Sequence, residues 1–426
     1  VIDARHLRLH VRRQAAGDRR AAQKQRHAGG GGDGDAGGAR QAVTPAAGEI
    51  PRPIPPGSSI PGGRGGRRPF FSGGGPPPTA LYNYNKKRKA FGVNMKKNIS
   101  DRIQLGKTGI QVSPVGCGVL PMGPGQLALP VDEGAELICY ALSKGINFID
   151  TAQYYRTYPY IRRALEMLEG RSVEACSAFA RPVISSKTLA SDYDGAYSAI
   201  LEECAALGVP YIDIFLLHEV RSGQFAMRQG AWRALMAAKA EGLVRAIGVS
   251  THHVDVVEEL TRVPACDVIF PLINYAGMGI RRGRSAASCA DMAAAIDAAH
   301  SAGKGIYSMK ALGGGNLAAH YREALDYVFG LDSIDSVMLG FGCRRDIDDI
   351  VSFLNGSMPQ DYVPDVSAKC VRVNQEDCEG CGTCLAVCHS AAIAYNKNGL
   401  AEIDRSKCIT CGYCAQACPV RAIIMF

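Results

Sequence analysis

Eight cysteines near the carboxyl end of the chain have the spacing of an iron–sulfur site. They form two runs of the pattern C-x₂-C-x₂-C-x₃-C, Cys378, Cys381, Cys384 and Cys388 and then Cys408, Cys411, Cys414 and Cys418. The second run repeats the first at an offset of 30 residues, which indicates an internal duplication. Three closely spaced thiolates suit a [4Fe–4S] cluster, whereas zinc sites use paired C-x₂-C knuckles and disulfides are rare in cytosolic chains.

A second group of polar residues falls at the ends of three consecutive predicted strands. Asp150, Lys187 and His218 each end an apolar run, and Tyr155 lies in the loop after Asp150. A neighbouring ammonium is expected to lower the pKa of the tyrosine, and the aspartate can hold that lysine charged. The histidine can donate a hydrogen bond to an oxygen that gains negative charge. The set is suited to protonating a carbonyl oxygen while hydride reaches the carbon.

Strand and helix patterns alternate around these residues. A predicted hairpin at 102–113 precedes short apolar runs that alternate with amphipathic stretches. The predicted strands are 114–119, 147–150, 182–187, 211–217, 244–249, 267–272, 305–309 and 336–339. The predicted helices include 132–143, 191–207 with Ser191 as N-cap, 231–240, 254–260, 285–302, 321–329 and 346–354.

Eight such units over roughly 250 residues predict an α/β fold, a (β/α)₈ TIM barrel, with its chemistry at the carboxyl ends of the strands. An open doubly wound sheet would need a glycine-rich phosphate turn after its first strand. Gly116-Cys-Gly118 is instead followed by Val-Leu-Pro, which favours the barrel.

The segment 102–354 resembles the aldo-keto reductase superfamily. The resemblance rests on Leu105-Gly-Lys-Thr-Gly109, Asp150-Thr-Ala-x-x-Tyr155, Ser186-Lys187, Leu217-His218, Ile247-Gly-Val-Ser250 and Met309-Lys-Ala-Leu-Gly-Gly-Gly-Asn-Leu317. It implies that Asp150, Tyr155, Lys187 and His218 form the family's catalytic tetrad. It also implies a barrel that binds NADP(H), or else NAD(H), without a Rossmann fold.

Departures from the family pattern are concentrated where the dinucleotide should bind. Where the family usually has Gly and Asn, this chain has Arg156 and Thr251, respectively. Where the family has Gln and an aromatic that stacks on nicotinamide, this chain has Phe270 and Met309. Arg344 and Arg345 are candidates for gripping a 2′-phosphate, although Asp346 would oppose this. The residues expected to contact the dinucleotide are Ser250, Thr251, Met309, Lys310, Leu312, Arg344 and Arg345.

The segment 370–426 resembles bacterial two-cluster ferredoxins. The resemblance implies two [4Fe–4S] clusters, with the fourth cysteine of each run crossing to the other cluster. Cluster one would use Cys378, Cys381, Cys384 and Cys418, and cluster two Cys408, Cys411, Cys414 and Cys388. A usual proline is replaced by His389, which removes no ligand. We interpret the remaining cysteines Cys117, Cys139, Cys176, Cys204, Cys266, Cys289 and Cys343 as small core residues and leave Cys370 unassigned.

Composition divides the chain into further parts. Residues 1–94 are rich in Gly, Pro, Lys and Arg and contain no cysteine, which predicts a disordered extension or a mis-assigned start with Met95 as the true start. The barrel should then span 95–355, a linker 356–369 and the ferredoxin domain 370–426. The net charge of +8 comes from the extension, so nothing in the folded part favours nucleic-acid binding. The absence of long apolar runs and of a signal peptide predicts a cytoplasmic protein without a membrane partner.

Two functions are compatible with these features. The first is an aldo-keto reductase-type enzyme that reduces an aldehyde or ketone, or oxidises the alcohol, with NAD(P)H and carries an iron–sulfur electron-transfer module. The alternative is an electron-transfer or structural subunit whose barrel is a non-catalytic dinucleotide-binding remnant. A small carbonyl substrate is expected in the first case, and a flavoprotein or other redox partner could dock on the ferredoxin domain in either.

Overall fold

The computed structural model describes residues 97–169, 181–365, 370–388, 390–408, 413–420 and 422–425. The predicted extension 1–94 and the residues Cys176, His389 and Cys411 lie outside these ranges. Within the described ranges, no helix has both the length and the apolar character needed to cross a membrane.

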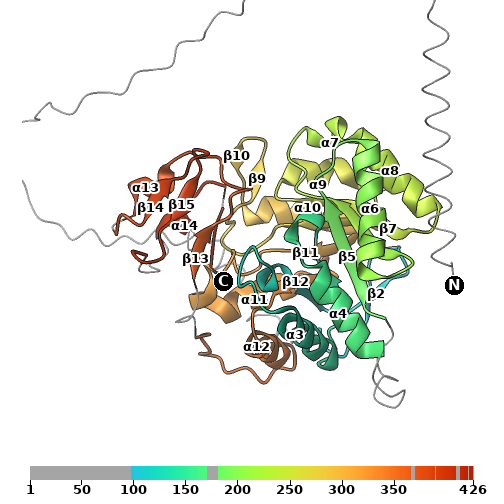
Figure 1. The fold of residues 1–426 in the computed structure, drawn as a ribbon, viewed down its shortest axis with the longest axis horizontal. Coiled ribbons are helices and arrows are strands. Elements are labelled where there is room, and N and C mark those ends of the chain that lie inside the picture. Colours follow the sequence, from blue (N-terminus) through green and yellow to red (C-terminus); the bar gives the residue numbers. More distant parts are fainter. Residues whose placement is uncertain are drawn as a thin grey trace, which may run out of the picture. The chain divides into compact units, whose positions relative to one another are not determined.

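Eight parallel strands close into a barrel, in the spatial order β11-β12-β3-β4-β5-β6-β7-β8. This confirms the predicted (β/α)₈ fold over the open sheet (Figure 1). The glycine at position 248 is required by close packing, because a Cβ there would lie 1.8 Å from the Val268 carbonyl oxygen on the next strand. The strands are β3 (Val115–Gly118), β4 (Phe148–Asp150), β5 (Val183–Thr188), β6 (Ile212–Leu217), β7 (Val244–Thr251), β8 (Val268–Pro271), β11 (Gly305–Ser308) and β12 (Ser336–Gly340).

Amphipathic helices follow the barrel strands and bury their apolar faces on them. One expected cap is wrong: Asp192, not Ser191, caps α6, and its carboxylate accepts the Gly195 N–H at 2.8 Å. The helices are α3 (Val131–Ser143), α4 (Tyr158–Glu169), α6 (Tyr193–Leu207), α7 (Gln224–Met227), α8 (Gln229–Ala240), α9 (Val254–Thr261), α10 (Cys289–Ser301), α11 (Tyr321–Phe329) and α12 (Arg344–Leu354).

A short hairpin closes the amino-terminal end of the barrel. It consists of β1 (Ile103–Gln104) and β2 (Gln111–Val112), which pair antiparallel as predicted. Its buried Leu105, Ile110 and Val112 belong to the same apolar cluster as residues of the barrel interior. The barrel is therefore filled and closed at this end, which leaves the carboxyl ends of its strands for a site.

Three further segments form the rim at the carboxyl ends of the strands. Two are 3₁₀ turns, Leu120–Met122 after β3 and Gln153–Tyr155 after β4. The third is a hairpin of β9 (Arg281–Arg282) and β10 (Ser285–Ala286), which follows β8. An N–H···O bond of 3.0 Å from Arg281 to the His252 carbonyl holds this hairpin against the loop after β7.

The carboxyl-terminal segment folds as two similar halves. β13 (Val371–Val373) pairs with β16 (Ile423–Met425), and β14 (Ile393–Tyr395) pairs with β15 (Ala401–Ile403). Each half has a one-turn helix, α13 (Thr383–Ala386) or α14 (Tyr413–Ala417). We call residues 370–426 the ferredoxin module; its internal repeat agrees with the duplication predicted from the sequence.

Candidate active site and cluster sites

A buried ion pair occupies the carboxyl ends of β4 and β5. The ammonium of Lys187 donates to a carboxylate oxygen of Asp150 at 2.7 Å and to the Thr151 carbonyl oxygen at 2.6 Å. Both side chains are almost fully buried. Burial lowers the pKa of Lys187 and raises that of Asp150, and each partner opposes the shift of the other. The 2.7 Å bond between opposite charges favours the ionised pair and so counteracts the effect of burial on both groups.

Tyr155 and His218 meet above this ion pair. The Tyr155 hydroxyl lies 3.4 Å from His218 Nε2, and the Lys187 nitrogen lies 5.2 Å from the centre of the Tyr155 ring. Tyr154 packs edge-on against Tyr155, with ring centres 5.1 Å apart. The structure therefore brings together all four residues that the strand-end pattern singled out.

The acidity expected for the tyrosine is not found in this arrangement. Burial, followed by the charge of Asp150, raises the pKa of Tyr155 well above its ordinary value. Burial and the Lys187 charge hold the pKa of His218 well below its ordinary range. The expectation that Lys187 makes the phenol acidic is therefore wrong here, because desolvation of the phenolate and the nearby Asp150 charge raise its pKa. At neutral pH the site presents a protonated phenol and a neutral imidazole.

Several residues that the sequence did not single out support these four. Ser185 and Tyr307 hydrogen-bond each other at 2.6 Å inside the barrel and adjoin Asp150. The guanidinium of Arg228 donates to the His218 carbonyl oxygen at 2.7 Å and to that of Thr188 at 2.9 Å. Arg228 thus ties together the ends of β5 and β6. In the sequence it is marked only as an arginine shortly before the predicted helix 231–240.

Two of the residues expected to contact the dinucleotide, Ser250 and Thr251, form hydrogen bonds within the barrel rim. Ser250 Oγ accepts the Glu219 N–H at 2.9 Å, and Thr251 Oγ1 donates to the Val220 carbonyl oxygen at 2.6 Å. Both hydroxyls thereby hold the loop that follows His218. The Ser250 hydroxyl can still donate its own proton to a ligand.

The expected contacts after β11 have different surroundings. Met309 extends the pairing of β11 with β8, and its N–H donates to the Pro271 carbonyl at 3.0 Å. Leu312 packs beside the apolar cluster of Tyr275, Met278 and Leu317. Lys310 has a left-handed backbone, with φ of 59°, and its ammonium lies 3.7 Å from the Asp377 carboxylate of the ferredoxin module.

Arg344 and Arg345 begin α12 and are exposed. Their guanidiniums lie 3.7 Å from the Glu136 carboxylate and 3.9 Å from that of Asp365, respectively. Asp346 does not face them as a simple opposing charge, because its carboxylate accepts the Gly342 N–H at 2.8 Å and the Cys343 N–H at 3.2 Å. Both arginines stay accessible to an anion, and their role towards a 2′-phosphate stays a prediction.

The four cysteines assigned to cluster one lie close enough to influence one another electrostatically. Burial raises the pKa of Cys384, and the thiols of Cys418, Cys378 and Cys381 raise it further. Cys384 and Cys418 are buried. Among the described residues, no three His, Cys, Asp or Glu side chains converge on one metal ion. This is compatible with a cube, in which each thiolate binds a different iron atom.

The two runs present their fourth cysteine in the same way. The Ala392 N–H donates to Cys388 Sγ and the Ala422 N–H to Cys418 Sγ, each at 3.3 Å. Such N–H···S bonds to cluster ligands help to set a cluster's potential. Of the set for cluster two, Cys411 lies outside the described residues.

The interpretation of the remaining cysteines as core residues is partly wrong. Cys117, Cys139, Cys204 and Cys266 are buried, whereas Cys289 is half-buried and Cys343 is exposed. Cys343 is exposed because it is the N-cap of α12 and lies at the surface end of that helix. Cys370, left unassigned, is half-buried.

The ferredoxin module contacts the barrel on both sides of the cluster-one ligands. Asp377, which precedes Cys378, pairs with Lys310, and Pro419, which follows Cys418, accepts a 3.0 Å hydrogen bond from Arg281. Glycine is needed at 314, where φ is 68° and a Cβ would lie 3.3 Å from the Ile424 side chain. These contacts are formed by chain segments far apart in sequence.

Comparison with protein families shows which family the chain belongs to. The model of the aldo/keto reductase family matches residues 114–337, more than half of the chain, and that of a 4Fe-4S dicluster domain matches 377–422. The chain belongs to the aldo/keto reductase family and carries a 4Fe-4S dicluster domain. Both resemblances inferred from the sequence are thus confirmed.

Individual relatives cover only part of the chain. Morphine 6-dehydrogenase of Pseudomonas putida is 31% identical over 155 residues, which are 36% of this chain and 49% of that protein. An aldo-keto reductase of Mycobacterium marinum is 32% identical over 165 residues, 36% of this chain and 54% of the relative. The chain thus spans about half the length of these curated relatives. A solved aldo-keto reductase of Bacillus halodurans is 15% identical with a TM-score of 0.48, covering 62% of this chain and 98% of that one.

Proposed function

We propose that this chain is an oxidoreductase that interconverts a carbonyl compound and its alcohol with NAD(P)H in the barrel. The observation that carries the proposal is the meeting of Tyr155 and His218 beside the buried Lys187–Asp150 pair. Family membership supports the same reaction class. A nicotinamide bound at the barrel mouth would supply the hydride.

The chain's own groups would handle the oxygen of the substrate. The protonated Tyr155 hydroxyl donates its proton to the carbonyl oxygen, and the neutral His218 orients that oxygen through an N–H. Lys187 remains charged against Asp150 and offsets negative charge that develops at the phenol oxygen. Because the phenol has a raised pKa, it keeps its proton until the substrate oxygen takes it.

The ferredoxin module would bind two [4Fe–4S] clusters with the ligand sets given above. The proximity of Cys378, Cys381, Cys384 and Cys418 supports the crossed assignment of cluster one. We further propose that the clusters exchange electrons with a separate redox protein, such as a flavoprotein, and that the protein acts in the cytoplasm.

One observation favours a second candidate function. Lys310, expected at the dinucleotide, is paired with Asp377 of the ferredoxin module. An electron-transfer subunit with a non-catalytic barrel would tolerate this pairing.

Titration and turnover would separate the two candidates. Protein purified anaerobically with reconstituted clusters is titrated with NADPH and NADH, followed by nucleotide fluorescence, and is then mixed with a panel of aldehydes and ketones. Saturable binding with carbonyl-dependent oxidation of the nucleotide supports the reductase. Binding without oxidation by any carbonyl, or no binding at all, supports the second candidate.

A further inference from the structure

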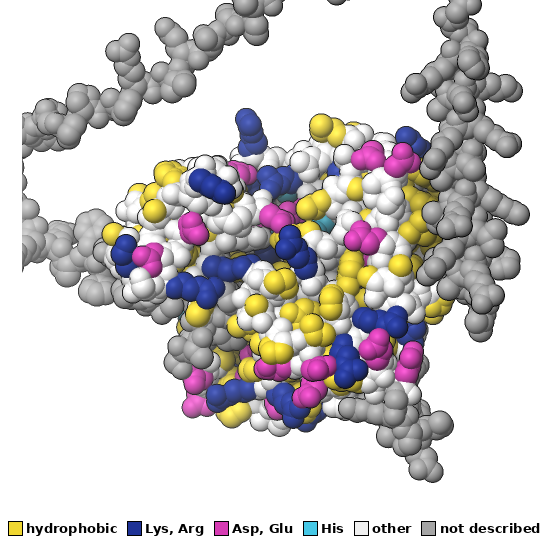
Figure 2. All heavy atoms as spheres, in the orientation of Figure 1, with side chains coloured by type: hydrophobic (Ala, Val, Ile, Leu, Met, Phe, Trp, Pro, Cys, Tyr) yellow, Lys and Arg dark blue, Asp and Glu magenta, His cyan; other side chains and the backbone are white. Residues whose placement is uncertain are grey.

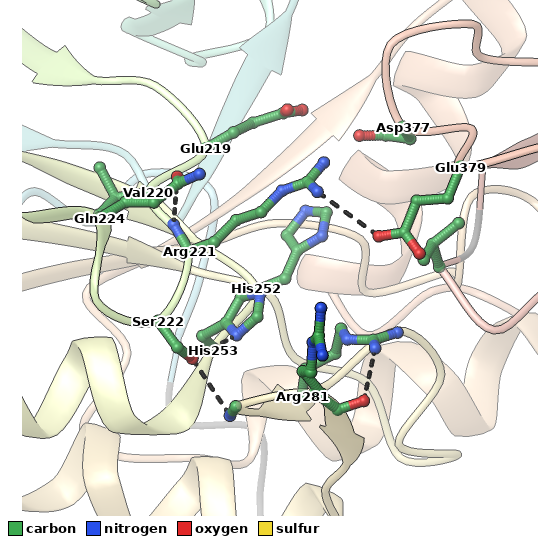
Figure 3. A pocket seen from close by; sticks show the side chains of 13 residues that line it. Glu219, Val220, Arg221, Ser222, Gln224, His252, His253, Arg281, Asp377 and Glu379 are labelled. Carbon is green, nitrogen blue, oxygen red and sulfur yellow. Dashed lines mark hydrogen bonds and ion pairs between the residues drawn. The ribbon is translucent and has the colours of Figure 1, made fainter. Parts of the chain in front are cut away.

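A polar pocket of about 650 Å³ lies where the ferredoxin module meets the barrel rim. Its volume is within the range of small-molecule sites, roughly 300–1,000 Å³. Figure 3 shows Glu219 and Arg221 pointing from the rim toward Asp377 and Glu379 of the module. The remaining wall comes from the loops after β6 and β7, the β9–β10 hairpin and Val420.

The pocket adjoins both candidate sites through consecutive residues. Glu219 directly follows His218 of the proposed tetrad, and Asp377 directly precedes Cys378 of cluster one. The Glu219 and Asp377 carboxyl groups face each other across the pocket and influence each other electrostatically. A ligand held here would lie between the barrel's candidate chemistry and cluster one.

Most charges on this wall are neutralised in pairs or lost by burial. Arg221 lies 3.5 Å from Glu379, and Asp377 lies 3.7 Å from Lys310. Burial, then the Asp377 charge, raises the pKa of Glu219 to about 8, so that it carries a proton at neutral pH. Burial lowers the pKa of His252 to about 3, which leaves this imidazole neutral.

Among the described residues, Arg281 and Arg284 carry the charges on this wall that no neighbouring opposite charge balances. The Arg281 guanidinium donates to two backbone carbonyls, of Pro419 at 3.0 Å and of Arg284 at 2.7 Å, and these bonds leave its charge unbalanced. Within the described part of the chain, no carboxylate forms an ion pair with Arg281 or Arg284. Asp255, which approaches the hairpin through the Gly283 N–H at 3.4 Å, belongs to α9 and is not part of the pocket wall.

The position of these two arginines is fixed by the hairpin. The Gly283 N–H donates to Ser222 Oγ at 3.1 Å, and Ser222 Oγ lies 2.8 Å from His253 Nδ1. Arg282, between them in sequence, leaves the pocket and forms two bonds with the Glu258 carboxylate, at 2.7 and 2.8 Å. Arg281 and Arg284 therefore line the pocket, whereas Arg282 holds the hairpin to Glu258 of α9.

We propose that this pocket binds a small molecule through a phosphate or carboxylate group held by Arg281 and Arg284. Guanidiniums suit such planar or tetrahedral oxyanions because they can donate two parallel hydrogen bonds. Two kinds of ligand could supply this anionic group. One is a carbonyl substrate with an acid group, and the other is a flavin nucleotide with its phosphate. The first source rests on the proposed function, whereas anion binding itself does not.

Direct binding measurements test the pocket without turnover. Full-length protein with reconstituted clusters is titrated anaerobically by calorimetry with inorganic phosphate, and then with two matched pairs, FMN against riboflavin and 2-oxoglutarate against its dimethyl ester. We expect the charged member of at least one pair to bind at least tenfold more tightly than its neutral partner. Preference for FMN identifies a flavin phosphate, and preference for 2-oxoglutarate identifies an acidic substrate.

Variants of the hairpin provide the matched control. Arg284→Gln and Arg281→Gln should each weaken binding of the charged ligand at least tenfold, Arg284→Lys should weaken it less, and Arg282→Gln should leave it unchanged. Arg284 is exposed, so its variants should fold, and unchanged cluster absorbance checks this. Equal binding of charged and neutral ligands, or equal losses in Arg282→Gln and Arg284→Gln, would overturn the proposal. Tyr155→Phe should bind the anion like the wild type even if the proposed reduction fails.

Discussion

Tyr155 is the residue on which the proposed chemistry depends most directly. Its hydroxyl faces His218 Nε2 at 3.4 Å, and burial keeps it protonated at neutral pH. Tyr155→Phe removes the proton donor and leaves the ring in place. We expect carbonyl reduction to fall about 10²–10⁴-fold, with dinucleotide affinity nearly unchanged. Steady-state rates with nucleotide fluorescence titration check this; activity within about twofold of wild type would exclude Tyr155 as the acid.

Glu203 is a buried acid on α6 behind the tetrad. It accepts a hydrogen bond from the Tyr158 hydroxyl at 3.1 Å, and burial raises its pKa from the ordinary 4.5 to about 7. The folded protein thus holds this proton more tightly than the unfolded chain does. Stability contributed by the protonated group is present below about pH 4.5 and is lost as the pH rises through about 7.

Glu203→Gln should therefore stabilise the barrel at pH 8. The shift corresponds to about 3 kcal/mol in the free energy of unfolding as an upper value. Thermal unfolding followed by circular dichroism between pH 5 and 8 should show a smaller decline in the variant. Glu202→Gln, at an exposed neighbouring acid, is the control and should follow the wild type. A wild-type stability that does not decline over this interval would contradict the assignment.

The sequence could predict that Asp150, Tyr155, Lys187 and His218 lie together, but not what surrounds them. Asp150, Lys187 and His218 end apolar strand runs, and the topology of a parallel barrel places such ends together. The burial that raises the pKa of Tyr155, and the pairing of Lys310 with Asp377, depend on packing between distant segments. Neither has a local sequence signal.

At the scale of helices and strands, too, local patterns in the sequence were predictive, whereas features that depend on long-range packing were missed. The barrel strands lie where apolar, β-branched runs predicted them. The prediction did not include α4, whose second residue is Pro159, or the β9–β10 hairpin, whose Arg-Arg-Gly-Arg sequence has no apolar alternation. That hairpin is held by backbone bonds to the loop after β7 and by contact with the module.

Within the ferredoxin module, the crossed ligand sets lead to a specific expectation. Cys384→Ser should remove a ligand of cluster one, because Cys384 is buried among Cys378, Cys381 and Cys418. Iron should fall from about eight to about four atoms per chain, while the barrel stays folded. Cys370→Ser, at a cysteine outside both runs, should keep all the iron. Zinc in place of iron in the parent protein would contradict the assignment.

Figure 2 shows Lys and Arg side chains interspersed with Asp and Glu on the face of the molecule that it draws. The basic residues 1–94 lie outside the described ranges, and their role is open to a direct test.

Removing residues 1–94 should leave iron content, stability and reductase activity unchanged. The reason is that their sequence is rich in Gly and Pro, a composition that is typical of segments which add little to a folded core. A protein starting at Met95 is compared with the full chain by melting temperature, iron analysis and steady-state rate. Mass spectrometry of the amino terminus of the native protein tests the start site. A truncated protein that precipitates or loses iron would refute the expectation.

The cofactors proposed for the whole molecule carry electrons in different numbers. A [4Fe–4S] cluster passes one electron at a time, whereas nicotinamide passes a hydride, which carries two. Because the sequence shows no flavin motif, we expect NADPH alone to leave the clusters of flavin-free protein oxidised. Anaerobic addition of NADPH should therefore change neither the visible absorbance nor the electron paramagnetic resonance spectrum.

Addition of FMN, or of a partner flavoprotein, should then allow the clusters to be reduced. The location of the pocket makes this test informative, since its wall includes Glu219 and Asp377, the sequence neighbours of His218 and Cys378. If FMN binds there, reduction through free FMN should be slower in Arg284→Gln than in Arg282→Gln. Equal rates in the two variants would indicate that electrons enter the ferredoxin module elsewhere, through a partner protein. Reduction of the clusters by NADPH without any flavin would show that the barrel and the module are coupled directly.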